Sequence, residues 1–309
     1  MQVGIARRAP QAGARRHPGR WAEAGTGYAF VAPAMAFFAL FLAFPLGFAI
    51  WLSLRHWNGF TPLGQAAFAG LENYAAMPAD RVLRKALLNT ALFAVASTAL
   101  QMAVAFLLAF TLWFYRLRFA TFLRALFFFP TVISMVFVGL TWQQLLGVDG
   151  PVAQLTQWLL AGRVAWLSAP DLVLWVVVWV ASWQWSGWTM MLFLAGMLAV
   201  DRELIEAAEL DGAGSATVAL RIVLPILRPV VALALLLNIV GGFQIFDTIY
   251  VLTGGGPNHA SESVATYTYW QAFSAYGPGE LGYASAVSVA MTLVLFVFAW
   301  LRVRMSRLV

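Results

Sequence analysis

The chain has 309 residues, of which 62% are hydrophobic and only 10% are charged, with a mean hydropathy of +0.79. Soluble globular domains carry about 25% charged residues, so this composition excludes an ordinary soluble protein and indicates a membrane protein. Cysteine is absent, which excludes disulfides, thiolate metal ligands and a cysteine nucleophile. The formal net charge is +6, and the placement of the basic residues favours membrane orientation over nucleic-acid binding.

The N-terminal segment is polar, rich in arginine and interrupted by glycine and proline. This composition predicts a disordered basic tail over residues 1–27. The apolar run that follows, 28–54, is much longer than the roughly 7–15 residues of a cleaved secretory signal. We therefore expect it to be retained as the first membrane helix.

Six apolar runs reach the length of about 20 residues that a helix needs to cross about 30 Å of hydrocarbon. They are the ranges 28–54, 86–114, 122–146, 172–199, 226–248 and 282–301. The alternation of about ten residues that is typical of membrane barrel strands is not seen. The sequence thus predicts an all-α membrane protein with six transmembrane helices and a membrane domain over 28–309.

Basic residues are unevenly divided between the alternate connecting segments. Only five lie in the segments predicted to be outside, namely Arg55, Arg81, Arg84, Lys85 and Arg163. The other 14 of the 19 Lys and Arg residues lie in the two terminal segments and the remaining loops. Because short basic loops resist translocation, this bias predicts that both termini are cytoplasmic in a multi-pass protein of the cell (inner) membrane.

The predicted outer segments have distinct local signals. The segment 56–84 is expected to be a folded loop with a short helix. The segment 147–171 begins with a turn at Asp149, Gly150 and Pro151 and continues as an amphipathic piece to Leu160. The segment 253–279 opens with three glycines and a proline, which exclude helix at that point.

The segment 200–225 is a charged loop between two apolar spans. Asp201 is placed to cap a short helix, because its carboxylate accepts the free N–H groups of a first turn. Gly212 follows Asp211 and permits a sharp turn, and Pro225 breaks or starts the next element. The predicted shape is helix, sharp turn, helix, and then the fifth span.

The spacing of small, acidic and proline residues in this loop resembles the cytoplasmic coupling loop of permease subunits in ATP-binding-cassette importers. The positions that match are Glu206, Ala207, Ala208, Asp211, Gly212, Ala213, Ile222, Leu224, Pro225 and Pro229. In that family the loop docks onto the ATPase subunit, which implies this role for the loop at 200–225. The chain departs from the family at Ala216 and Ala219, where aromatic residues are frequent, so a smaller or differently shaped contact is implied.

Other segments are similar to those of carbohydrate-importer permeases. They are the ranges 71–74, 127–130, 246–257 and 281–286. The chain most resembles the first permease of sugar and glycerol-phosphate importers. The resemblance implies the type I permease fold, half of a heterodimeric pore with a second permease, an ATPase dimer inside and a solute-binding protein outside.

The sequence lacks the signals of a catalytic subunit. Lys85 is the only lysine, and no glycine-rich phosphate loop precedes it. The histidines His17, His56 and His259 have no paired metal-ligand spacing. We therefore expect no catalytic residue, metal or cofactor in this chain, with ATP bound by the partner ATPase subunits and with lipid around the spans.

Polar side chains inside apolar spans mark a substrate pathway, because they are costly unless they face protein or water. Amides and carboxylates bind sugar hydroxyls, and indole rings pack against sugar C–H faces. The candidates are Gln184, Trp185, Ser186, Thr189, Gln244 and Asp247. Asn238 either lines this pathway or holds helices together.

Two other functions stay open at this point. An ion-gradient-driven secondary transporter needs buried ionisable relays, and Asp247 near an interface is thin support for one. An inverted repeat, a second sign of that class, is not evident. A membrane enzyme is disfavoured by the absence of a nucleophile or metal cluster. An importer for glycerol-phosphate is the alternative within the importer class.

Overall fold

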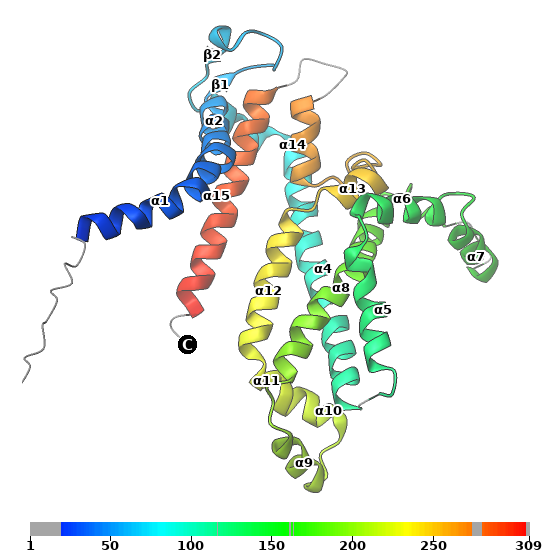
Figure 1. Ribbon diagram of the computed structural model, residues 1–309. Coiled ribbons are helices and arrows are strands. Elements are labelled where there is room, and N and C mark those ends of the chain that lie inside the picture. Colours follow the sequence, from blue (N-terminus) through cyan, green and yellow to red (C-terminus); the bar gives the residue numbers. More distant parts are fainter. Residues whose placement is uncertain (1–19, 116, 161, 163, 274–279, 307–309) are drawn as a thin grey trace, which may run out of the picture. The chain divides into compact units, whose positions relative to one another are not determined.

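The computed structural model describes residues 20–115, 117–160, 162, 164–273 and 280–306, which are mostly helical (Figure 1). The chain divides into two compact units, residues 1–49 and residues 50–309. The first unit contains α1 (Arg20–Phe38) and η1 (Ala39–Ala43), followed by the start of α2 (Phe44–Ser53). Helix α1 begins at Arg20, within the predicted disordered tail 1–27, of which residues 1–19 lie outside the described residues.

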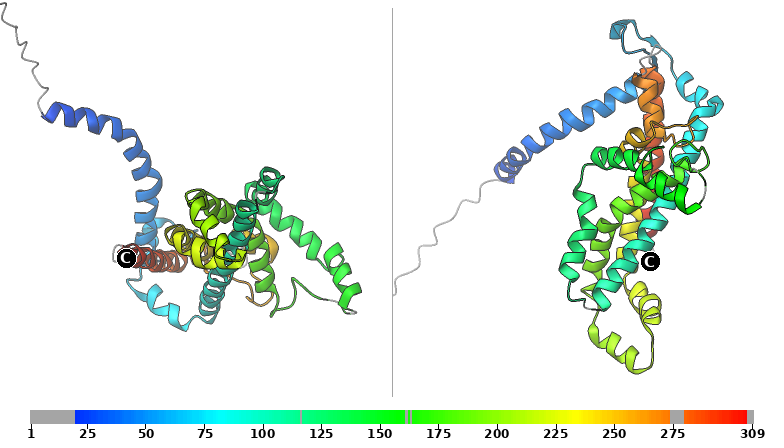
Figure 2. Two further views of the ribbon diagram at one scale, coloured as in Figure 1. Left: turned by 90° about the horizontal axis from the view of Figure 1, so that it is seen from below. Right: turned by 90° about the vertical axis from the view of Figure 1, so that its right-hand side faces the viewer.

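The second unit is built on two long helices that pack along each other, α4 (Arg81–Phe114) and α8 (Val173–Met197). The 34 residues of α4 extend for about 51 Å at a rise of about 1.5 Å per residue. Helix α12 (Arg228–Phe243) packs mainly on α4, and α5 (Ala120–Val132) packs on α8 (Figures 1 and 2). These four helices form the frame on which both candidate sites lie.

Glycines allow this frame to pack closely. A Cβ on Gly187 would lie 2.0 Å from the carbonyl oxygen of Phe127 in α5, and a Cβ on Gly242 would lie 2.8 Å from Cα of Ala94 in α4. Small residues at helix contacts are the usual means of association in membranes, where burial of apolar surface gives little driving force. The pairs α5–α8 and α4–α12 therefore each depend on a glycine.

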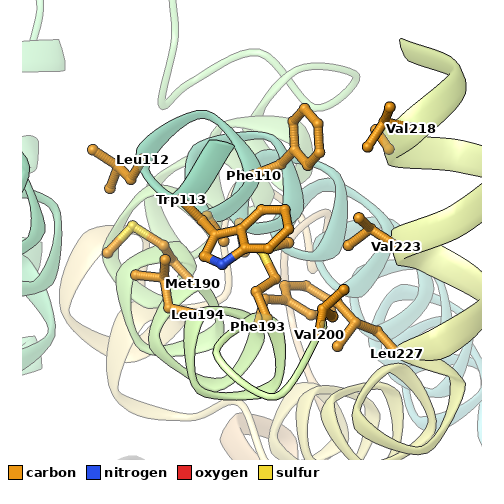
Figure 3. Close-up of a cluster of buried hydrophobic side chains, with 14 of the residues drawn as sticks. Phe110, Leu112, Trp113, Met190, Phe193, Leu194, Val200, Val218, Val223 and Leu227 are labelled. Atoms are coloured by element: carbon orange, nitrogen blue, oxygen red, sulfur yellow. The ribbon is translucent and has the colours of Figure 1, made fainter. Parts of the chain in front are cut away.

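One end of the frame is filled by a cluster of large apolar side chains (Figure 3). Phe110 and Trp113 of α4 and Phe193 of α8 meet Val218 and Val223 from the segment after the loop turn. That segment consists of α10 (Ser215–Thr217), η4 (Val218–Val223) and α11 (Leu224–Ile226). The loop at 200–225 is thus packed into the frame on one side.

The other end of the second unit carries short elements and two helices. Strands β1 (Arg55–His56) and β2 (Ala67–Phe68) form an antiparallel pair. They are followed by α3 (Glu72–Ala76) and η3 (Met77–Ala79), with η2 (Leu63–Gln65) between the strands. The expected folded loop with a short helix in 56–84 is confirmed. Helix α14 (Val264–Phe273) packs against α15 (Leu281–Ser306).

Two predicted spans are broken. The range 122–146 is not one helix, because α5 and α6 (Met135–Leu146) meet at an angle of 95°, with the break between them at Ile133 and Ser134. The range 226–248 is also interrupted, because α12 meets the preceding helix at 78° and ends at Phe243. Residues 244–246 are non-helical and α13 (Asp247–Leu252) follows. The amphipathic piece to Leu160 is a helix, α7 (Pro151–Leu160), and 254–257 are non-helical as expected.

Within the described residues, three helices are long and apolar enough to cross a membrane, or five if each bent pair is one span. The three are Tyr28–Ser53, Arg81–Phe114 and Leu281–Trp300. Helix α8 has 25 residues and is long enough, but it is not among the candidates. Its tryptophans, together with Ser182, Gln184 and Ser186, lower its hydropathy, so length and composition alone do not establish the predicted six.

Asp80 joins three helices at the end of the second unit that is opposite the loop at 200–225. One carboxylate oxygen accepts the N–H groups of Val82 and Leu83 at 2.9 and 3.0 Å and so caps α4. The other accepts the hydroxyls of Tyr267 in α14 and Tyr283 in α15. Burial alone would raise the pKa of Asp80, but these donors outweigh it and hold the pKa below its ordinary value.

We expect Gly242→Ala to destabilise the protein by about 1–3 kcal/mol, because the new methyl group overlaps the backbone of Ala94. The neighbouring Gly241 is the matched control, since nothing lies within 4 Å of a Cβ at that position in the same helix. Melting temperatures of the two detergent-purified variants test this. Equal melting temperatures would show that α4 and α12 do not pack at Gly242.

We expect Asp80→Asn to lower stability near neutral pH by about 1 kcal/mol, because hydrogen bonds to a charged acceptor are stronger than those to an amide. A carboxyl whose pKa is lowered by folding stabilises above its unfolded pKa and loses that contribution as the pH falls. The gap between the wild-type and Asp80→Asn melting temperatures should therefore narrow below about pH 4. A gap that is constant across this pH range would show that the charge of Asp80 does not contribute.

Candidate functional site

The first candidate site is the loop that projects beyond the ends of α4 and α8 (Figures 1 and 2). Its first helix is α9 (Arg202–Leu210), and Asp201 caps it as predicted by accepting the N–H of Glu203 at 3.0 Å. Ile205 is buried in the apolar cluster with 2% of its surface exposed. By contrast, Leu210 is 89% exposed and Glu206 is also exposed. Ile205 thus packs α9 against the frame, and the opposite face of α9 is exposed.

The turn after α9 depends on Gly212, whose φ of +85° is rare for residues with a side chain. The N–H of Gly212 bonds to the carbonyl of Glu209 at 3.0 Å, and the N–H of Ala213 bonds to that of Ala208 at 2.9 Å. This pair of backbone bonds is a Schellman motif, which closes a helix through a left-handed residue. Within the described residues the Asp211 carboxylate accepts no hydrogen bond, so the turn is made by backbone groups.

The residues that match the importer pattern divide into two sets by burial. Those that are exposed are Glu206, Ala207, Asp211, Gly212 and Pro229. Those that are half-buried are Ala208, Ala213, Ile222, Leu224 and Pro225. Val218 and Val223 between them are fully buried, so the second half of the loop is part of the core. The surface open to a partner is therefore α9, its turn and exposed apolar positions such as Leu220, which is 60% exposed.

The second candidate site is a cavity of about 370 Å³ between α4, α8 and α12. Its polar lining residues are Ser97, Gln101, Asn238, Gln244 and Asp247. Its aromatic lining residues are Phe93, Trp185, Trp188 and Phe246. A few convergent polar groups among aromatic rings are typical of sites for small ligands.

Two features leave polar groups of this cavity free for a ligand. The hydroxyl of Ser97 is buried and has no hydrogen-bond partner among the described residues. Gln244 is exposed because α12 ends one residue before it, so its amide is not covered by neighbouring helices. The non-helical residues 244–246, which follow Phe243, all line the cavity.

The family profile described as "Binding-protein-dependent transport system inner membrane component" matches residues 102–309, which include both the loop and most of the cavity lining. The chain belongs to this family.

Relatives of this inner membrane component are permeases of ATP-binding-cassette transporters. A probable ABC transporter permease, YurN of Bacillus subtilis, is 34% identical over 271 residues, which is 86% of this chain and 91% of that protein. The lactose transport system permease LacF of Rhizobium radiobacter is 29% identical, with 91% of this chain and 94% of that protein covered. A chain of a bacterial alginate ABC transporter, solved with an alginate pentasaccharide-bound periplasmic protein, shares the fold with a TM-score of 0.79 and 20% identity, covering 94% and 98% of the two chains.

The cavity of this family member contains half of the pathway residues predicted from sequence. Trp185, Gln244 and Asp247 line it. Ser186 does not, because it bonds to the carbonyl of Trp183 in its own helix at 3.1 Å and lines a separate apolar crevice. Thr189 is fully buried and shares a 3.2 Å hydrogen bond with Asn238.

Gln184 does not line the cavity. It is 1% exposed and donates to the carbonyl of Ile133, at the break between α5 and α6, at 3.2 Å. Asn238 bonds to Thr189 of α8 and also lines the cavity.

The sequence analysis missed Ser97 and Gln101, which supply the α4 wall of the cavity. A signal was present, since polar residues four positions apart lie on the same face of a helix. Thr90 precedes Ser97 by two turns and extends the same face. A search for polar residues at helical spacing within the second span would have found this wall.

Proposed function

We propose that this chain forms half of the pore of an ATP-binding-cassette importer for a sugar or oligosaccharide. The observation that carries the proposal is that α4, α8 and α12 hold a cavity with an amide- and indole-rich lining between them and support a projecting helix at one end. A second permease subunit completes the pore, an ATPase dimer binds ATP and docks on the loop at 200–225, and a solute-binding protein delivers the substrate from outside. The chain itself is not an enzyme.

The proposed topology has six transmembrane helices with both termini in the cytoplasm. The six are the three helices that are long and apolar enough to cross a membrane, the two bent pairs counted as one span each, and α8. The concentration of 14 of the 19 basic residues in the termini and the inner loops supports this orientation. It places α9 on the same side of the membrane as the ATPase.

The lining of the cavity supports a neutral sugar over glycerol-phosphate. Among the described residues that line it there is no Lys or Arg, and Asp247 contributes a negative charge. A phosphate dianion is normally bound by cationic side chains or by helix N-termini. Indole faces and amides suit the C–H surfaces and hydroxyls of a sugar. The chain belongs to a family of binding-protein-dependent transport components, and this membership favours the proposed importer over an ion-gradient-driven transporter.

We expect Gly212→Val to reduce sugar uptake and co-purification of the ATPase by at least about tenfold while the subunit still inserts into the membrane. A branched residue at φ +85° costs about 1–3 kcal/mol of backbone strain and disrupts the turn that orients α9. Gly214→Val is the control, because Gly214 has φ −72° and no atom lies within 4 Å of a Cβ there. Normal uptake and co-purification in Gly212→Val would show that the loop is only a solvated connector.

We expect Gln244→Leu to lower sugar transport at subsaturating sugar about five- to tenfold, because it removes the amide from the cavity wall. Folding of the subunit should be unaffected, since Gln244 is exposed. Gln157→Leu in α7 makes the same exchange at an exposed position away from the cavity and should transport normally. Transport kinetics over a panel of labelled sugars measure the effect. Unchanged kinetics in Gln244→Leu would show that Gln244 is not part of the substrate pathway.

A further inference from the structure

Arg202 connects the projecting helix α9 to the long helix α4. Its Nη2 donates to the main-chain oxygen of Trp113 at 3.1 Å, and its Cζ lies 4.6 Å from the centre of the Trp113 ring. Among the described residues, no other side-chain hydrogen bond joins residues 201–226 to another helix. The residues of this loop that belong to the apolar cluster, among them Ile205, Val218 and Val223, contact the frame through non-directional apolar packing.

The contact stabilises the C-terminal end of α4 and fixes the N-terminal end of α9. Trp113 lies in the last turn of α4, where backbone carbonyls have no partner within the helix. A cation at this end also complements the negative pole of the helix. The planar guanidinium of arginine can donate to the carbonyl and stack on the indole together, which a lysine cannot reproduce. Arg202 directly follows the capping Asp201, so the start of α9 is fixed at two adjacent residues.

Trp113 is itself held firmly in the frame. It is 6% exposed, and Figure 3 shows it between Phe110, Phe193 and Leu194. Its ring lies 6.3 Å from that of Phe110. The Phe106 ring in turn lies 6.2 Å from Phe110 and meets Phe193 of α8 edge-on at 5.7 Å. A displacement that reaches Trp113 is therefore passed to both long helices.

Helix α4 is continuous from Trp113 to the cavity. Gln101, which lines the cavity, precedes Trp113 by three to four helical turns, or about 18 Å along the axis. Ser97 lies one further turn along the same wall. No break interrupts α4 between these points, in contrast to the breaks at both ends of α12.

We propose that Arg202 is a positioning residue that fastens α9 to α4, so that movement of α9 by the ATPase shifts the cavity wall formed by Ser97 and Gln101. The inference rests on the proposed function and names the connection through which the loop acts on the cavity. Ile205 and the Gly212 turn hold α9 in place, and the directional contact of Arg202 determines that α4 moves with it.

Variants of Arg202 distinguish a role in coupling α9 to α4 from a role in binding the ATPase. In Arg202→Gln, we expect ATPase co-purification and basal ATP hydrolysis to stay normal, while sugar imported per ATP hydrolysed falls about five- to tenfold. Arg202→Lys should recover part of this ratio, because an ammonium can still donate to the Trp113 carbonyl. Arg221→Gln is the matched control, since Arg221 is exposed in the same loop and makes no hydrogen bond or ion pair within the described residues.

A thiol probe reports the motion of α4 directly, because the chain has no native cysteine. In a Gln101→Cys background, maleimide labelling should differ between the nucleotide-free and the ATP–vanadate-trapped complex. We expect Arg202→Gln to abolish this difference and Arg221→Gln to preserve it. A label that does not respond to nucleotide in the background protein would overturn the proposal, because α4 would then not move.

The outcomes distinguish the connection from the function on which it rests. If Gly212→Val abolishes uptake but Arg202→Gln keeps both the import ratio and the labelling difference, the Arg202 connection is wrong and the proposed function stands. If Arg202→Gln loses uptake only in proportion to lost ATPase association, Arg202 is a docking residue and the proposal is also wrong. If Gly212→Val transports normally, the proposed coupling function fails and the connection fails with it.

Discussion

Backbone groups in an apolar environment must find partners within the protein, and this requirement shapes the breaks after α5 and after α12. At the break between α5 and α6, the carbonyl of Ile133 accepts from the buried amide of Gln184. At the break after α12, the N–H of Gln244 bonds to Gly241 at 3.1 Å, and the carbonyl of Ile245 accepts from Ser263 at 2.8 Å. Each break is thus tied to a second segment, and residues 244–246 of the second break line the cavity.

The unbroken helices α4 and α8 have a different role. Helix α4 runs from the Asp80 cap to Trp113 without interruption, and α8 packs along it. Interior packing is close to that of a crystal, so helices joined in this way transmit displacement with little local adjustment. The broken segments border the ligand cavity, and the continuous ones connect it to the projecting loop. In the proposed importer, the broken segments adjust around the substrate, and the continuous helices transmit force from the loop to the cavity.

The sequence predicted those features that depend on neighbouring residues. The Asp201 cap and the Gly212 turn follow from local backbone chemistry, and apolar runs of 20 residues or more located the helices. The breaks at 133–134 and 244–246 were missed because hydropathy averages over a window and does not register a change of direction. The role of Gln184 was not predictable, since its partner Ile133 lies 51 positions away in the chain. The burial of Ile205 and the contact of Arg202 with Trp113 likewise depend on packing between distant segments.

The lining of the cavity is consistent with a site that must also release what it binds. Fully buried charge pairs dissociate slowly, because separating them leaves charges without compensation. The cavity offers amides, a hydroxyl and indole faces, with its carboxylate, Asp247, at an exposed position. Such groups recognise a neutral sugar through several weak contacts, each of which water replaces at little cost. In the proposed importer, selection of the solute can then be left to the proposed binding protein, and a modest affinity in the permease favours passage.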